Sequence, residues 1–291
     1  MDKLCSVTAN CAPKMWRLSD SETRETIRLL GIDRRASEPF GFLGPHHDVR
    51  YALHSHAQDQ LLWPVSGVIT IEADKSLYVV GPGMAVWIPA LTQHATSVRN
   101  GYSATLFVPK NRRRLQPVCQ VIKLTPLLRE LLNTATTQPG GSQRFRRALF
   151  DLIDELGTAG RATPACPSLQ IPTSRPLRRA VEFLMANLDS VSMTELTRQA
   201  GMSERSLRRH FRAETGISVA TYLGQARMIR AMQLLLEDRA RSVSEVSISV
   251  GFKSPSAFAC AFRRATGMSP GRFRRSLSGN GPNQQSVISD W

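Results

Sequence analysis

A motif of about ten residues occurs twice in the C-terminal third of this chain. Ser192 to Gly201 and Ser242 to Gly251 each read Ser-x-x-Glu, then an apolar residue, and end in glycine. Ser-x-x-Glu is the pattern of a capping box at a helix start, and glycine permits the positive φ that ends a helix. A second matching pair, Phe211 to Gly216 and Phe262 to Gly267, follows the two copies. The sequence therefore predicts one supersecondary unit used twice.

Each copy predicts a short helix, a tight turn and a second helix, which is the helix-turn-helix arrangement. We place the two units at about 192–213 and 242–265. In the first unit we expect Ser203 to cap the second helix, with Leu207 and Phe211 on its buried face. A further helix is expected to join the units and to set their spacing and angle. Its apolar stripe consists of Tyr222, Ala226, Ile229, Met232 and Leu236.

Positive charge is concentrated in the same region. The 291 residues carry a net charge of +15, and Ser174 to Arg275 holds 18 Lys/Arg against 8 Asp/Glu, or +10 of that excess. A localised excess of this kind favours a polyanionic partner such as nucleic acid. No apolar run reaches the ~20 residues of a membrane span, Met1 to Arg17 lacks the apolar core of a secretion signal, and the cysteines form no C-x-x-C pair. We therefore expect a cytoplasmic protein that does not enter a membrane.

The second helix of the first unit carries arginines on its outward faces. Arginine binds guanine O6 and N7 with two hydrogen bonds, or clamps phosphate oxygens. A solvated basic face is the alternative interpretation, and the duplicated motif favours DNA reading over it. The predicted DNA contacts of this unit are Arg205, Ser206, Arg208, Arg209 and Arg212.

The second unit is less basic where it should read DNA. Its second helix starts near Ser254, with Pro255 in the first turn, and its outward positions are small. We expect the first unit to specify sequence and the second mainly to position the protein, with both helices entering successive major grooves about 34 Å apart. The predicted contacts of this unit are Ser254, Pro255, Ser256, Ala259, Cys260, Arg263 and Arg264.

Residues 174–276 resemble the DNA-binding domain of the AraC/XylS family of bacterial transcriptional regulators. The resemblance implies base contacts from both second helices, double-stranded DNA as partner, and RNA polymerase as a further candidate partner. Cys260 departs from the family pattern, because a basic or polar residue is often found there. The residues that carry the resemblance are Gly251-Phe252, Ser254, Phe258, Phe262 to Arg264, Thr266 to Pro270 and Phe273-Arg274.

The N-terminal half has a different texture. From about Gly41 to Pro109 short β-rich runs alternate with Gly and Pro turns, which predicts a sandwich or small barrel. Two patterns in this region resemble the cupin motifs, and the resemblance implies a barrel that senses a small-molecule effector. Gln60 stands where Glu is usual and Leu91 where Gly is usual. The matching residues are His54, His56, Gln60 and Gly67, then Gly83, Pro89 and His94.

His54, His56, Gln60 and His94 form the candidate effector or metal pocket. Three converging imidazoles suit a divalent ion such as Zn²⁺, Ni²⁺, Fe²⁺ or Mn²⁺. The alternative is that these histidines are hydrogen-bonded residues of the barrel mouth or line a pocket for an organic ligand. A cupin-type enzyme is a competing function, and Gln60 in place of a carboxylate counts against it. A DNA-repair alkyl acceptor would need a reactive cysteine in a metal or Pro-Cys-His-Arg setting, which the chain lacks. We therefore expect no catalytic residues.

These observations predict an α+β chain. A cupin-like β-barrel with a helical extension precedes an all-α domain with two helix-turn-helix units. The helices of the extension either cover the barrel or form the interface of a homodimer. The predicted segments are an N-terminal extension (1–40), the barrel (41–110), the helical extension (111–157), a linker (158–173), the DNA-binding domain (174–276) and a flexible tail (277–291).

Overall fold

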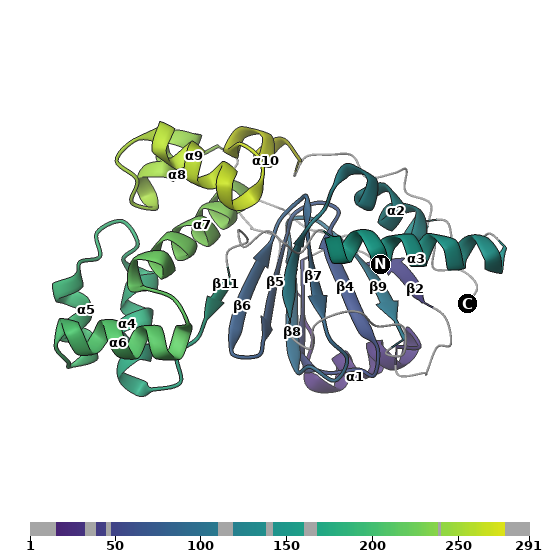
Figure 1. The fold of residues 1–291 in the computed structure, drawn as a ribbon, viewed down its shortest axis with the longest axis horizontal. Helices are drawn as coiled ribbons and strands as arrows, with labels where there is room; N and C mark the ends of the chain where they lie inside the picture. The colour runs from purple at the N-terminus through teal and green to yellow at the C-terminus, as the bar shows by residue number, and fades with distance from the viewer. Residues whose placement is uncertain are drawn as a thin grey trace, which may run out of the picture.

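The computed structural model describes residues 16–32, 39–44, 48–109, 119–137, 142–159, 168–237 and 240–276. Eleven strands form one part of the molecule, which we call the β half, and helices α4 to α10 form a second part, the helical half (Figure 1). The predicted α+β class is therefore confirmed. No helix in these ranges is long and apolar enough to cross a membrane. The predicted tail at 277–291 lies outside the described residues.

The β half consists of two sheets. The six-stranded sheet has the order β1-β3-β8-β5-β6-β11, and the five-stranded sheet has the order β10-β7-β4-β9-β2. All neighbouring strands are antiparallel except β1 and β3. The first sheet contains β1 (Trp16–Arg17), β3 (Val49–His54), β8 (His94–Arg99), β5 (Val68–Ala73), β6 (Ser76–Val80) and β11 (Ser168–Gln170). The second contains β10 (Gln120–Lys123), β7 (Met84–Ile88), β4 (Asp59–Pro64), β9 (Ser103–Val108) and β2 (Phe40–Leu43).

The sheets extend beyond the predicted barrel range of 41–110. β1 comes from the predicted extension, β10 from the predicted helical segment, and β11 from the predicted linker. Each is short and lies at the edge of a sheet, paired with one neighbour. Edge strands of two to four residues are specified by the neighbour that they pair with, so their own sequences carry little pattern.

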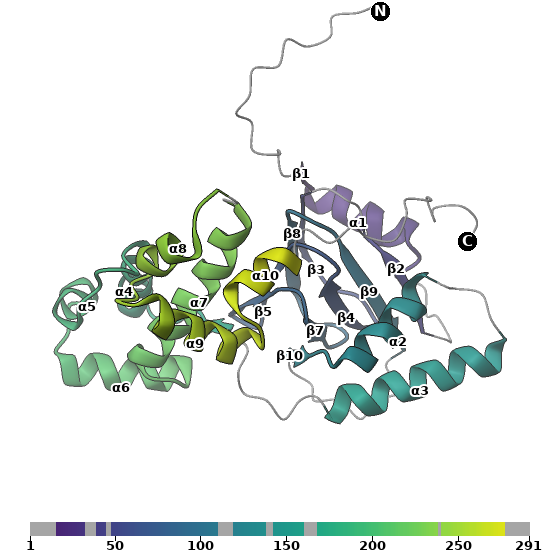
Figure 2. The ribbon, with the colours of Figure 1, turned by 90° about the horizontal axis from the view of Figure 1, so that it is seen from above.

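Besides the helical half, three helices in the described ranges pack on the β half. α1 (Asp20–Leu29) begins with a complete capping box between Ser19 and Glu22 and contacts β3. α2 (Pro126–Thr137) lies on β2 and β9, and α3 (Gln143–Ala159) packs on α2 (Figure 2). The buried leucines and isoleucine of α2 and α3 share a core with residues of the five-stranded sheet, so these helices cover that sheet. The shared core includes Leu61, Trp63, Leu128, Leu132, Leu149 and Ile153.

The helical half is arranged around one long helix, α7 (Val219–Glu237). It contacts α6, α8, α9 and α10 and also reaches β5 and β11. Its buried side chains include those of the predicted stripe and others around the helix, such as Met228 and Leu235, because it has neighbours on several sides. The remaining helices are α4 (Arg175–Ala186), α5 (Met193–Ala200), α6 (Glu204–Thr215), α8 (Val243–Ser249), α9 (Pro255–Thr266) and α10 (Pro270–Ser276).

Candidate functional site

The first helix-turn-helix unit consists of α5 and α6. The Ser192 hydroxyl accepts a hydrogen bond from the backbone N–H of Glu195 at 3.2 Å, and Gly201 ends α5 with a φ of +65°. Ser203 caps α6, as predicted, by accepting from the N–H of Ser206. The Glu195 carboxylate pairs with Arg198 instead of returning to the Ser192 backbone, so only half of the predicted capping box forms here. The turn between the helices is nevertheless defined at both ends.

The outward surface of α6 is basic. Leu207 and Phe211 are 0 % and 1 % exposed, and the Phe211 ring lies edge-to-face on Tyr222 of α7, with 5.1 Å between centroids. This packing directs the opposite side of the helix to solvent. Arg208 forms an ion pair with Glu204 at 2.6 Å. Four of the predicted reading residues of this helix are exposed and Ser206 is half-buried; the exposed ones are Arg205, Arg208, Arg209 and Arg212.

The second unit consists of α8 and α9. Its capping box between Ser242 and Glu245 is complete, and Gly251 follows α8 with a φ of +85°. Ser254 caps α9 by accepting from the N–H of Ala257 at 3.1 Å, with Pro255 at the first position, as predicted. The buried face of α9 is formed by Phe258, Phe262 and Thr266.

The outward surface of α9 is small and weakly polar over its first two turns. Ser254, Pro255, Ser256 and Cys260 are exposed and Ala259 is half-buried. Arg263 and Arg264 follow on the last turn and are exposed, and an Arg264 Nη lies 3.7 Å from Cys260 Sγ. The predicted contact residues of both units thus lie on the helices where we expected them.

Two exposed residues beside these surfaces were not among the predicted contacts. His210 follows Ser206 by one turn on α6, and an Nη of Arg209 lies 3.3 Å from its Nε2. Lys253 immediately precedes the cap of α9. The signal that could have identified them is position: both stand beside a reading helix, and the Lys253 ammonium group adds phosphate attraction even when it faces no base.

The β half brings the three predicted histidines together. His54 ends β3 and pairs in register with His94, the first residue of β8, and His56 follows β3. The centroid of the His94 ring lies 4.2 Å from that of His54 and 5.1 Å from that of His56. One ring nitrogen from each histidine lies within 4.8 Å of the other two. These residues could therefore share one ligand atom or ion.

Backbone contacts determine the tautomer of each imidazole. The Nδ1 atoms of His54, His56 and His94 lie 2.7, 2.8 and 2.8 Å from backbone carbonyl oxygens. A carbonyl oxygen only accepts, so each Nδ1 carries a proton, and in a neutral ring Nε2 then presents a lone pair. Burial lowers the pKa of His94 to about 3 and also lowers that of His54, which keeps both rings neutral. The accepting carbonyls belong to Ala52, Gln58 and Thr92.

Two further atoms, His94 Nε2 and Gln60 Oε1, lie in this pocket. The buried Nε2 of His94 has no hydrogen-bond partner among the described residues. Gln60 Oε1 lies 3.2 Å from His56 Nε2, while the Gln60 amide nitrogen donates to Thr105 Oγ1 at 3.0 Å. An amide oxygen only accepts, so this contact needs a proton on His56 Nε2, a positive ion shared by both atoms, or a turned amide group.

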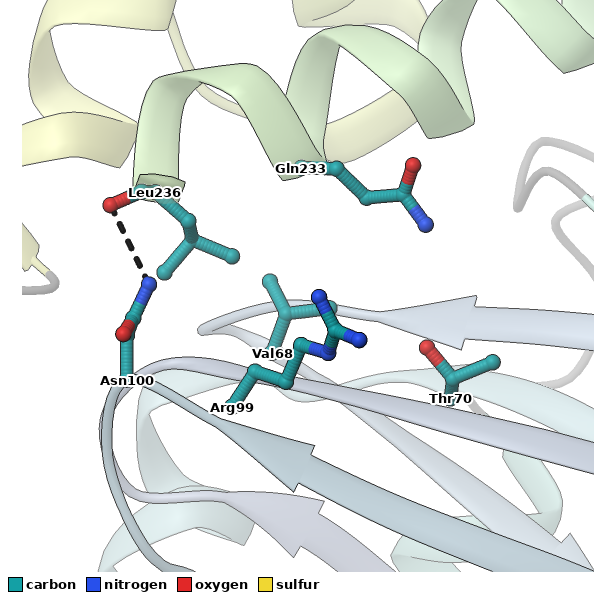
Figure 3. A pocket seen from close by; sticks show the side chains of 6 residues that line it. All are labelled: Val68, Thr70, Arg99, Asn100, Gln233 and Leu236. Carbon is teal, nitrogen blue, oxygen red and sulfur yellow. Dashed lines mark hydrogen bonds between the residues drawn. The ribbon is translucent and has the colours of Figure 1, made fainter. Parts of the chain in front are cut away.

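The two halves meet at a small pocket at the end of α7 (Figure 3). Asn100, in the turn between β8 and β9, donates from Nδ2 to the carbonyl oxygen of Leu236 at 3.2 Å. Within the helical half, the Glu214 carboxylate of α6 accepts from the backbone N–H groups of Thr173 and Ser174 at the start of α4, at 2.8 and 3.0 Å. The lining residues of the pocket are Val68, Thr70, Arg99, Asn100, Gln233 and Leu236.

Comparison with known proteins identifies the helical half. Residues 196–276 match a family model described as a helix-turn-helix domain. The HTH-type transcriptional regulator NimR of Escherichia coli is 32 % identical over 231 residues, which cover 76 % of this chain and 81 % of NimR. The chain belongs to the AraC-type transcriptional regulators. The HTH-type transcriptional regulator RipA of Corynebacterium glutamicum is 28 % identical over 228 residues, covering 76 % of this chain and 63 % of RipA.

One solved structure similar to this AraC-type chain contains DNA. It is the DNA-binding domain of the transcriptional factor AdpA in complex with a target DNA, 35 % identical, covering 35 % of this chain and 93 % of that one, with a TM-score of 0.33. The match to the helix-turn-helix family model and the similarity to NimR confirm the family and the function predicted from the sequence: this AraC-type chain is a DNA-binding transcriptional regulator.

Proposed function

We propose that this regulator reads DNA with α6 and α9 placed in two successive major grooves, under the control of an effector bound in the β half. The observation that carries the proposal is that α6 and α9 share the same three structural features. Both helices begin with a serine cap after a tight turn, bury an aromatic face, and lie against the same central helix, α7. One major groove admits one α-helix, and grooves on one side of B-DNA recur about every 34 Å.

The two helices have different roles in this proposal. Arg205 and Arg209 lie one turn apart on the exposed face of α6, which suits bidentate contacts with guanine. Arg208 reaches DNA only when its pair with Glu204 opens, so a phosphate oxygen is its expected partner. On α9 the small outward residues permit close approach to the groove floor, and Arg263 contacts phosphate. The first unit then supplies most of the sequence preference.

A selection experiment tests this division. Duplexes that bind tightly are enriched from a random library, and their affinities are measured at several salt concentrations. We expect Arg209→Ala to cost about 1–3 kcal/mol and to relax the preference at one base position. Arg24→Ala is the matched control, because Arg24 is an exposed arginine on α1 of the β half. An equal loss for Arg209→Ala on every duplex would contradict base reading.

We also propose that the effector is a divalent transition-metal ion held by His54, His56 and His94, with Gln60 beside it. The support is the tautomer pattern: all three Nδ1 atoms donate to carbonyls, which is how metal-bound histidines are oriented. The unpartnered Nε2 of His94 and the carbonyl oxygen of Gln60 add two lone pairs at the same place. Nitrogen-rich sites of this kind favour Zn²⁺, Ni²⁺ or Cu²⁺. A bound ion would supply a positive charge that ties β3 to β8.

Calorimetric titration of chelator-treated protein with Zn²⁺ or Ni²⁺ tests the metal proposal. We expect one ion per chain and a rise in Tm with free metal concentration, since binding to the folded state stabilises it. His94→Ala should abolish both effects. His210→Ala is the matched control, because His210 is an exposed histidine on α6. Binding that survives in His94→Ala, or no binding to the unsubstituted chain, would favour an organic ligand for this pocket.

The α2–α3 surface is our candidate homodimer interface. These helices bury one face on the five-stranded sheet but leave Leu127, Phe145 and Leu152 exposed by 55 %, 47 % and 42 %. Exposed large apolar side chains on two packed helices favour a second copy as partner. Sedimentation should show a dimer that Phe145→Asp together with Leu152→Asp converts to a monomer. A monomeric unsubstituted chain would contradict this interface.

A further inference from the structure

We propose that Arg227 sets the position of the second reading helix relative to the first; this inference rests on the two-groove binding proposed above. Arg227 lies near the middle of α7 and touches a segment on each side. Its Nε donates to the carbonyl oxygen of Leu188 at 2.9 Å. Its guanidinium carbon lies 5.9 Å from the centroid of the Phe252 ring, within the range of a cation–π interaction.

The Leu188 contact belongs to the side of the first unit. Leu188 follows the end of α4, and α4 packs directly on α5 and α6. Leu188 is buried just beyond the C-cap of α4, and a buried carbonyl group without a donor destabilises the fold. Arg227 supplies that donor. Burial lowers the pKa of the Arg227 guanidinium group, and the nearby Asp189 carboxylate acts in the opposite direction by attracting its charge. Arg227 thereby connects α7 to the support of α6.

The Phe252 contact belongs to the side of the second unit. Phe252 lies between α8 and α9, and its ring packs edge-to-face on Phe258, with 5.5 Å between centroids. Phe258 is fully buried and belongs to the core face of α9. A shift of the Arg227 guanidinium group would therefore move the rings of Phe252 and Phe258, and with them α9, the helix that we place in the second groove.

The absence of a side chain at Gly251 makes room for the Arg227 guanidinium group beside the Leu188 carbonyl oxygen. A Cβ added there would lie 2.6 Å from an Arg227 Nη and 2.7 Å from the Leu188 carbonyl oxygen. Three segments distant in sequence thus converge on one guanidinium group: the end of α4, the middle of α7 and the turn before α9. The length of α7 sets the distance between the two units. It does not fix how far each unit is rotated about α7, and that rotation is fixed by side-chain contacts such as those of Arg227.

The consequence for DNA binding is a fixed spacing. Adding one base pair between two half-sites moves the second by about 3.4 Å along the axis and turns it by about 35°. A reader whose two helices are held rigidly should lose affinity for such a duplex. A reader whose second helix is loosely held should tolerate the change but gain less from the second half-site.

Three duplexes distinguish these cases: the selected site, the same site with the half contacted by α9 scrambled, and the site with one base pair inserted between the halves. The full-length chain is compared with Arg227→Met, Arg227→Lys and Arg230→Met. Methionine keeps an unbranched apolar stem as far as the position of Nε but removes the guanidinium group and both of its contacts, and lysine keeps a donor and the charge. Arg230→Met is the matched control, because it removes the same charge from the same helix.

We expect Arg227→Met to bind the selected site about tenfold more weakly, while its affinity for the scrambled duplex stays within about twofold of the unsubstituted chain. The loss of affinity that the inserted base pair causes should also be smaller for Arg227→Met than for the unsubstituted chain. Arg227→Lys should recover at least half of the affinity for the selected site that Arg227→Met loses. Arg230→Met should bind all three duplexes as the unsubstituted chain does. If Arg227→Met fails to fold, Phe252→Leu removes the cation–π contact and the edge-to-face contact with Phe258 but keeps the Arg227–Leu188 hydrogen bond, and it should show the same pattern more weakly.

An equal loss on all three duplexes, or full retention of the two-site preference by Arg227→Met, would overturn the role of Arg227. If the unsubstituted chain is itself indifferent to scrambling of the second half-site, the two-groove model fails and this inference fails with it. The two failures are therefore separated by the behaviour of the unsubstituted protein.

Discussion

Gly81, in the connection between β6 and β7, lies against the ring of Phe273 on α10, so that a Cβ added at Gly81 would lie 2.6 Å from Phe273 Cζ. Phe273 is fully buried and packs edge-to-face on Phe262, at 5.2 Å between centroids. Phe262 belongs to the core face of α9. The β half is therefore linked through two aromatic rings to a predicted reading helix, and a change in the sheets has a direct route to the DNA-binding surface.

Substitution of Gly81 tests that route. Gly81→Ala adds a methyl group that the Phe273 ring must avoid, so α10 should shift away from the β half. We expect faster amide hydrogen exchange in α10 and in the β6–β7 connection, and a lower Tm. Gly224→Ala is the control, because nothing lies within 4 Å of its added Cβ on α7 and alanine favours helices by up to about 1 kcal/mol. Unchanged exchange in α10 of Gly81→Ala would contradict a packed contact.

Two cysteines offer a chemical test of where α9 meets DNA. Cys260 is exposed on α9, whereas Cys119 is buried and its pKa is raised by burial to about 12. The thiolate is the reactive form, so at pH 8 iodoacetamide should label Cys260 much faster than Cys119. Addition of the selected duplex should protect Cys260 and leave the slow labelling of Cys119 unchanged, as measured by peptide mass spectrometry. Equal labelling of Cys260 with and without DNA would exclude it from the interface.

The reading helices were predictable because their information is local. Ser203 and Ser254 lie directly before the helices that they cap, and Leu207 and Phe211, like Phe258 and Phe262, are four residues apart on one helical face. Caps and periodicity are properties of neighbouring residues, so a single sequence is enough to place the outward side chains.

The rest depends on contacts between distant residues. The sequence predicts a linker where β11 lies, because these three residues become a strand only by pairing with β6. The role of Arg227 is not visible in the sequence, since the Leu188 carbonyl that it reaches is 39 residues away. For the histidines, spacing predicted convergence, but the tautomers follow from backbone carbonyls whose positions require the fold.

The capping boxes of the two units differ, and this difference has a measurable consequence. Ser242 and Glu245 satisfy each other's backbone N–H groups, whereas Ser192 caps without the reciprocal bond from Glu195. Loss of a capping serine costs about 0.5–2 kcal/mol. Ser242→Ala should lie toward the upper end of that range and Ser192→Ala toward the lower end, as measured by urea unfolding. The reverse order would show that the reciprocal bond adds nothing.

Leu91 occupies a backbone conformation that favours glycine and lies beside the histidine pocket. Its φ is +67° and its N–H donates to the carbonyl oxygen of His56 at 2.8 Å, so the left-handed turn is retained although glycine is absent. A non-glycine residue pays about 1–2 kcal/mol for this conformation, and glycine instead loses about 0.5–1 kcal/mol of backbone entropy.

Leu91→Gly should therefore leave the free energy of unfolding unchanged or raise it by up to about 1 kcal/mol, because strain relief offsets the entropy. Leu91→Val should lower it, because a β-branched side chain tolerates positive φ least. Both variants are compared by urea unfolding with chelator present, which separates backbone strain from metal binding. Metal titration of the same variants should then show weaker binding only for Leu91→Val, since the turn at Leu91 leads directly into His94. A destabilised Leu91→Gly would mean that the exposed leucine side chain, and not the turn, supports this edge of the pocket.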